Sequence, residues 1–109
     1  MFKKGGRQPV LKPFVSIVIP AKNEAKNIVN ILNNLSQQTY PEDLFEVIVV
    51  DDKSQDYTAT IVNDFMGNIS NLQLLSTAGV ESSLRYKKHP LNLGIRKSQG
   101  EILLLTDAD

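Results

Sequence analysis

The stretch VIVVDD, residues 47–52, joins four β-branched apolar residues to two carboxylates. An apolar run of this length predicts a strand that is buried on both faces, which is typical of parallel sheets covered by helices on either side. Asp51 and Asp52 would then follow the carboxyl end of that strand, where ligands bind in open α/β sheets.

Similar apolar runs on either side of this stretch predict three more strands, so that strands are expected at 15–19, 47–50, 72–75 and 101–106. Helical patterns separate the strands. This alternation predicts an α/β fold with a mostly parallel sheet, right-handed crossovers and helices on both faces. The expected strand order is 3-2-1-4, a Rossmann-like half in which the first and fourth strands are neighbours.

Three helices are expected between the strands. The first opens at Asn23, a residue type that caps helices, and its apolar side chains recur at the spacing of one buried face. Asp56 is the expected cap of the second helix, and Gly67 is its expected end. The third helix is expected over 92–99, after a long polar loop over 76–90.

Polar residues follow three of the four predicted strands: Asn23 and Glu24, Asp51 and Asp52, and Asp107 and Asp109. They should gather at one edge of the sheet, because the carboxyl ends of parallel strands lie together. Asp107 and Asp109 can share a face if the backbone there stays extended. Two clustered carboxylates repel each other unless a cation relieves them. Mg²⁺ or Mn²⁺, bridging to phosphate oxygens, is the cation that suits oxygen ligands of this kind.

The composition indicates one small globular domain, with 109 residues of which 41% are hydrophobic and 22% charged. The basic residues of segment 1–13 have no acid beside them, and this segment is expected to be a flexible, solvated tail, with no nucleic-acid partner. The absence of cysteine excludes disulfides and thiolate metal sites. The lack of cysteine also fits the cytoplasmic location that is expected. No apolar stretch reaches the ~20 residues of a membrane span, so attachment to the cytoplasmic face of a membrane is expected only through segments outside this chain.

Three stretches together resemble the family 2 glycosyltransferases, an inverting group with the GT-A fold. They are SIVIPAKNE (16–24), VVDDKSQD (49–56), and the segment from LNLGI (91–95) to the Asp-x-Asp sequence at 107–109. The resemblance implies that 14–109 is the nucleotide-sugar-binding part of a GT-A domain. The family's acceptor-binding half and its general base lie beyond Asp109, so the resemblance assigns no catalytic base here.

The resemblance implies roles for three carboxylates. Asp52 would accept a hydrogen bond from the N–H of uracil, which suits a group that only accepts. Asp107 would bind hydroxyls of the ribose or the sugar. Asp109, with Asp107, would hold Mn²⁺ or Mg²⁺, and the metal would neutralise the diphosphate leaving group.

The resemblance also implies nucleotide contacts for residues around the first strand end. The backbone of Pro20 and Ala21 would line the base pocket. Asn23 and Glu24 are also expected to bind the nucleotide. Lys87 matches a basic position near the base or the phosphates, and the competing interpretation is a solvated loop charge.

Two residues stand apart from the pattern. Lys53 occupies a position where the family commonly has Gly or Asn, and it would either reach a phosphate or face solvent. His89 is the only histidine. One histidine makes no metal site, so it is expected to be a loop residue.

The expected function is binding of a UDP-sugar through a divalent metal. In the complete protein the sugar would pass with inversion to a saccharide or lipid acceptor, as in cell envelope polysaccharide synthesis, whereas the 109 residues alone would be inactive. One alternative is a catalytically inert nucleotide-binding or self-associating fragment. A receiver-type phosphoacceptor domain is a remote third, because its acid pair follows the first strand and here the pair follows the second.

Self-association is expected from the last predicted strand. In the order 3-2-1-4 this strand lies at an edge of the sheet, and its apolar run at 102–105 carries no Lys, Pro or bulge. An unprotected apolar edge is a template for pairing with another chain.

Overall fold

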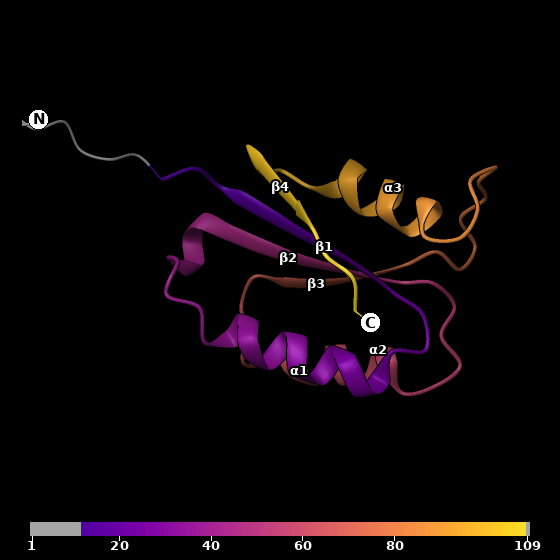
Figure 1. Cartoon of the computed structure of the whole chain (residues 1–109), viewed down its shortest axis with the longest axis horizontal. Helices are drawn as coiled ribbons and strands as arrows, with labels where there is room; N and C mark the ends of the chain where they lie inside the picture. Colours follow the sequence, from indigo (N-terminus) through magenta and orange to yellow (C-terminus); the bar gives the residue numbers. More distant parts are fainter. Residues whose placement is uncertain (1–11, 109) are drawn as a thin grey trace, which may run out of the picture.

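The computed structural model describes residues 12–108, which form an α/β domain (Figure 1). Within that range the strands are β1 (Val15–Ala21), β2 (Phe45–Asp51), β3 (Leu72–Ser76) and β4 (Ile102–Leu105). The helices are α1 (Ala25–Ser36), α2 (Thr58–Phe65) and α3 (Lys88–Lys97), with a short 3₁₀ turn, η1 (Glu42–Leu44), before β2. Most of the predicted basic tail lies outside the described residues.

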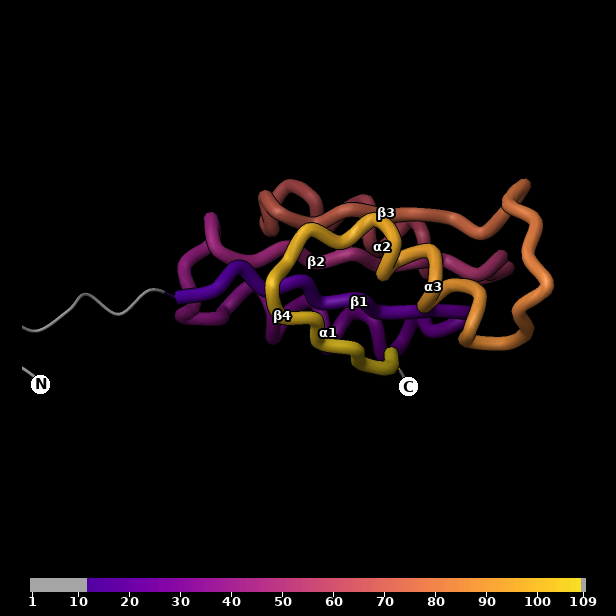
Figure 2. Tube along the Cα trace, turned by 90° about the horizontal axis from the view of Figure 1, so that it is seen from above, coloured from indigo at the N-terminus to yellow at the C-terminus, as the bar shows by residue number. Residues whose placement is uncertain are grey.

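The four strands form one parallel sheet in the order β3-β2-β1-β4, which confirms the predicted fold class and strand order. The register pairs Ala21 with Asp51, and Asp51 with Ser76. The ends of β1, β2 and β3 therefore lie level, and the loops that follow them emerge at one end of the molecule (Figures 1 and 2).

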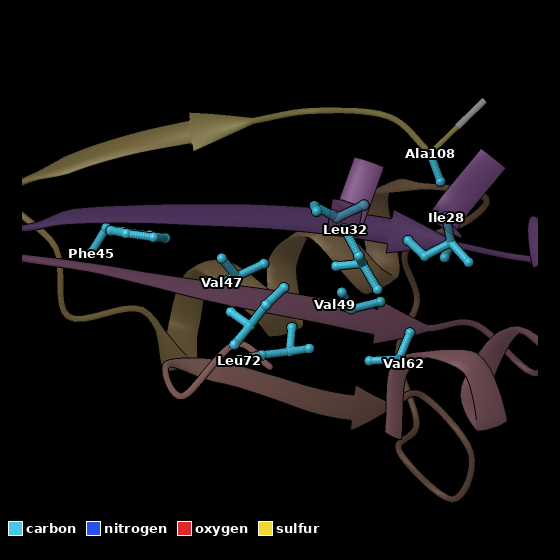
Figure 3. Packing of buried hydrophobic residues seen from close by; sticks show 11 residues of the cluster. Ile28, Leu32, Phe45, Val47, Val49, Val62, Leu72 and Ala108 are labelled. Atoms are coloured by element: carbon cyan, nitrogen blue, oxygen red, sulfur yellow. The ribbon is translucent and has the colours of Figure 1, made fainter. Parts of the chain in front are cut away.

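Helices cover both faces of the sheet. α1 and α2 pack on one face, where Ile28, Leu32 and Val62 meet Val47 and Val49 of β2 (Figure 3). α3 covers the other face (Figure 1), where the buried residues are Val18, Ile48 and Val50. Alternate residues of β2 thus enter two different cores, as the uninterrupted apolar run predicted.

α3 differs from its prediction. It begins at Lys88 rather than at residue 92 and ends at Lys97. Pro90 interrupts the apolar pattern but lies in the first turn of the helix, where its missing N–H costs nothing. His89 therefore belongs to this helix and not to the loop, which corrects its prediction.

The cap predicted for α1 was also wrong. Asn23 has φ +54°, in the left-handed region, and the residue at the N-cap position is Glu24, whose side chain makes no capping hydrogen bond. α2 ends at Phe65, two residues before the predicted stop at Gly67. Within residues 12–108, no helix is both long and apolar enough to cross a membrane.

Candidate functional site

A cavity of about 180 Å³ opens at the carboxyl edge of the sheet. Its lining comes from the end of β1 and the loop after it, the loop after β2, the start of α3 and the segment after β4: Pro20, Ala21, Lys22, Glu24, Asp52, Lys87, Pro90 and Ala108. Pro20, Ala21, Glu24, Asp52 and Lys87 were predicted from the sequence to share one site. The structure brings all five to the same cavity, although they lie up to 67 positions apart in the chain (87 − 20).

Asp52 is held firmly in this cavity. Its backbone N–H donates to the carbonyl oxygen of Ala21 (2.8 Å), which extends the β1–β2 ladder past the end of the strands. Its carboxylate Oδ1 accepts a hydrogen bond from Thr77 Oγ1 (2.6 Å), and Thr77 is fully buried. Thr77 was missed by sequence reasoning. Its position directly after β3, level with Asp52, was the available signal.

Asp107 reaches the cavity through Lys87. The Lys87 Nζ lies 2.7 Å from Asp107 Oδ1, and both side chains are about half exposed, at 53% and 52%. Such an exposed pair contributes about 0–1 kcal/mol to stability, so it matters mainly for where it places the two charges. It sets a cation and a carboxylate together beside the cavity that Asp52 lines. A nucleotide contact for Lys87 stays a prediction.

The next residue, Ala108, fixes the segment after β4. Its side chain is 2% exposed and packs into the core beside Ile28 (Figure 3). Asp107 is exposed while Ala108 is buried, so the segment alternates as an extended chain does. Asp109 lies outside the described residues.

Asn23 does not line the cavity. Its backbone N–H donates to Ser54 Oγ (2.9 Å), and its side-chain Oδ1 accepts from the N–H of Gln55 (2.7 Å). These bonds fasten the loop after β1 to the loop after β2. Its left-handed backbone is one that Asn tolerates better than most residues. A direct part for Asn23 in ligand binding stays a prediction.

Asp56 joins the starts of two helices. It was predicted to cap α2, but the N-cap residue of α2 is Tyr57, which makes no side-chain capping hydrogen bond. Asp56 instead accepts with Oδ1 from the N–H of Thr58, the first residue of α2 (3.0 Å), and with Oδ2 from the N–H of Ala25 at the start of α1 (3.1 Å). The hydroxyl of Thr58 also donates to Oδ1, and this bond is the main cause that lowers the pKa of Asp56. Because the folded state lowers this pKa, its stabilising contribution is present above the unfolded value of about 3.9 and is lost as pH falls through the folded value.

The backbone conformation at Lys53 explains why the family commonly has Gly or Asn at this position. Its φ is +60°, so the position after the acid pair requires the left-handed conformation that Gly and Asn adopt most readily. Lys53 lines a second, more open cavity of about 780 Å³, together with His89 and the loop 79–84. In this cavity wall the His89 Nε2 is buried and has no hydrogen-bond partner within residues 12–108.

The described residues show no group of three or more His, Cys, Asp or Glu side chains that could hold a metal ion. Asp107 supplies carboxylate oxygens next to Lys87, a residue of the cavity lining, and such oxygens suit Mn²⁺ or Mg²⁺. The predicted second ligand, Asp109, is outside the described range, so the metal site stays a prediction.

Comparison with known proteins identifies a family with the same sequence pattern. The family model described as glycosyl transferase family 2 matches residues 16–109. Glycosyltransferase AglE of Haloferax volcanii is 42% identical over 97 residues, which cover 89% of this chain and 31% of that protein.

Two solved structures share the fold. Staphylococcus aureus TarS 1-349 in complex with UDP-GlcNAc matches with a TM-score of 0.75 and 35% identity, over 87% of this chain and 26% of that one. The mannosyltransferase PcManGT from Pyrobaculum calidifontis, in complex with GDP-Man and Mn²⁺, matches with a TM-score of 0.77 and 37% identity, over 91% of this chain and 28% of that one.

The chain spans about a third or less of the length of these proteins. Within that span the match includes the strand ends that line the cavity, and the three stretches singled out in the sequence all fall inside it. The chain therefore belongs to glycosyl transferase family 2.

Proposed function

We propose that this chain binds a nucleoside diphosphate sugar, with uridine as the nucleoside, in the cavity at the carboxyl edge of the sheet. The observation that carries the proposal is that Asp52 and Lys87 line one cavity and that Asp107 forms an ion pair with Lys87. A carboxylate, a cation and a second carboxylate correspond to the three polar parts of such a donor: base, diphosphate and hydroxyls. Complexes with UDP-GlcNAc and with GDP-Man among the structural relatives support donor binding in general.

Asp52 is the proposed contact to the base. The uracil ring presents one N–H between two carbonyl groups, and a carboxylate, which only accepts, complements that N–H. The ring nitrogen of cytosine at the same position is an acceptor and would face the carboxylate without a proton. UDP should therefore bind more tightly than CDP.

Asp107 and Asp109 are the proposed ligands of a divalent metal, Mn²⁺ or Mg²⁺. When bound, the metal would supply positive charge to the diphosphate. Lys87 adds a second positive charge for the diphosphate. Residues of this chain would therefore hold the donor at its base, through Asp52, and at its diphosphate.

In the longer protein that the relatives imply, we propose transfer of the sugar to an acceptor hydroxyl with inversion. Inversion requires a general base within hydrogen-bond reach of that hydroxyl. None of the described residues can be nominated for this role, so the 109 residues should bind the donor without transferring the sugar. Transfer to any acceptor by this chain, above the background of hydrolysis, would contradict this part of the proposal.

Calorimetric titration with UDP and Mn²⁺ tests donor binding. We expect Asp52→Asn to weaken UDP binding by about 1–3 kcal/mol, because an amide loses the charge-assisted acceptor. Asp64→Asn is the matched control, since it removes one exposed carboxylate on α2 away from the cavity. Asp109→Asn should instead remove the dependence of binding on Mn²⁺. If Asp52→Asn and Asp64→Asn both bound UDP like the parent chain, the assignment of the base contact would be wrong.

A further inference from the structure

Thr77 stands where the β2–β3 ladder continues past its last strand residues. The register pairs Asp51 with Ser76, so Asp52 and Thr77, the residues that follow them, are opposite each other on the two neighbouring chain segments. The N–H of Thr77 donates to the carbonyl oxygen of Asp51 (3.1 Å), and its own carbonyl accepts from the N–H of Val80 (3.0 Å). The Thr77 backbone is therefore anchored on both sides.

The Thr77 hydroxyl is hydrogen-bonded to the Asp52 carboxylate. It is fully buried, and its Oγ1 lies 2.6 Å from Asp52 Oδ1. A carboxylate only accepts, so the hydroxyl must be the donor. Within residues 12–108 no hydrogen bond reaches the other oxygen, Oδ2, although Asp52 lines the cavity. One oxygen of Asp52 is thus engaged by the protein and the other is left for a ligand.

We propose that Thr77 is a positioning residue that makes Asp52 selective for a base with a single N–H, of the uracil kind, over a base with two adjacent donors, of the guanine kind. This inference rests on the proposed function. Uracil needs one carboxylate oxygen. The guanine edge presents N1–H and N2–H side by side, and this pair fits best when both carboxylate oxygens accept in parallel, as they do in bidentate pairs.

The effect is a preference and not an exclusion. Oδ1 keeps a second lone pair while it accepts from Thr77. A guanine, however, would have to share Oδ1 with the Thr77 hydroxyl, whereas uracil can use Oδ2 alone. The preference for uracil is assigned to this hydrogen bonding.

The test compares Thr77→Val with Thr77→Ser. Valine keeps the shape of threonine but removes the donor, whereas serine keeps the donor. Affinities for UDP and for GDP are measured calorimetrically with Mn²⁺ for the parent chain and both variants. We expect Thr77→Val to lower UDP affinity about tenfold, which corresponds to about 1.4 kcal/mol, and to shift the UDP:GDP affinity ratio toward GDP by a similar factor. Thr77→Ser should keep the parent ratio.

A purely structural role for Thr77 predicts something different. It would lower the melting temperature of Thr77→Val and leave the UDP:GDP ratio unchanged, and that result would overturn the proposal. Equal ratios for Thr77→Val and Thr77→Ser would overturn it as well. If Thr77→Val does not fold, Thr77→Ala takes its place and is compared with Thr77→Ser in the same way.

A measurement without nucleotide separates this inference from the proposed function. Side-chain couplings of Asp52 by NMR report whether its carboxylate keeps one rotamer. The parent chain and Thr77→Ser should show one rotamer, and Thr77→Val should show averaging. A parent chain that binds neither nucleotide would refute the proposed function, while the rotamer result would still decide whether Thr77 positions Asp52. Averaging in the parent chain itself would overturn the positioning role.

Discussion

Lys53 keeps a bulky side chain in a backbone conformation that favours glycine. Its φ of +60° places it in the left-handed region, which costs a residue with a Cβ about 1–2 kcal/mol. The sequence showed only that Lys53 stands where the family commonly has Gly or Asn. The structure supplies the reason, because the backbone directly after Asp52 takes the left-handed conformation.

Replacing Lys53 by glycine should therefore stabilise the fold. The gain of about 1–2 kcal/mol from the relieved backbone exceeds the loss of about 0.4–1 kcal/mol from the greater freedom of glycine in the unfolded chain. Urea unfolding should show a small increase in the free energy of unfolding. Lys53→Ala is the matched control, since it removes the same side chain and keeps the Cβ. An equal increase for Lys53→Ala would attribute the effect to the side chain instead.

At the scale of elements, α3 is held by a close contact that local sequence patterns do not reveal. A Cβ on Gly94 would lie 2.4 Å from Val18 Cγ1 and 3.1 Å from Val50 Cγ2. Glycine at this position lets the helix approach β1 and β2, which sets the first turn of α3, with Lys87 just before it, beside the cavity. The helical pattern alone placed the start at residue 92, because Pro90 resembles a loop residue until its place in the first turn is known.

Gly94→Ala should destabilise the fold although alanine is the better helix former. Overpacking of this kind costs about 1–3 kcal/mol, against a gain of up to about 1 kcal/mol in helix propensity. Gly67→Ala is the matched control, because a Cβ there meets nothing within 4 Å. Thermal unfolding should show a lower midpoint for Gly94→Ala and an unchanged or higher midpoint for Gly67→Ala. The same midpoint for both variants would mean that α3 can move away from the sheet at little cost.

At the scale of the whole molecule, β4 is an apolar edge. Within residues 12–108 it pairs only with β1, and its side chains are between 37% and 51% exposed: Ile102, Leu103, Leu104 and Leu105. The free backbone groups on its outer side can pair with a second copy of the same strand. We propose a twofold dimer through β4, since isologous contacts predominate in homo-oligomers.

Sedimentation at increasing protein concentration tests this dimer. We expect the parent chain to self-associate and Leu105→Lys to remain monomeric, because a lysine on an edge strand disfavours edge-to-edge pairing. Val80→Lys, which adds the same charge to an exposed apolar residue of the loop after β3, should self-associate like the parent. A monomeric parent chain at high concentration would contradict the proposal.

The sequence was sufficient for the order of the strands and for most of the cavity. The double-faced apolar run of β2 and the polar residues after three of the strands predicted the sheet and the place of Asp52 at its carboxyl edge, whereas Lys87 was assigned to the site through the family resemblance. Sequence reasoning did not find contacts that depend on register and on packing between distant segments. Thr77 meets Asp52 across 25 positions, and Asp56 reaches Ala25 across 31. No local spacing records either contact.

The most direct test of the account is to locate the nucleotide on the sheet. Backbone NMR spectra of the chain would be followed during titration with UDP and Mg²⁺. The account predicts that the largest shifts fall at the carboxyl edge, at Ala21, Asp52, Thr77 and Lys87. Shifts confined to the opposite edge, where a cavity of about 330 Å³ is lined by Phe14, Glu46 and Asn71 among others, or no shifts at saturating UDP, would contradict it.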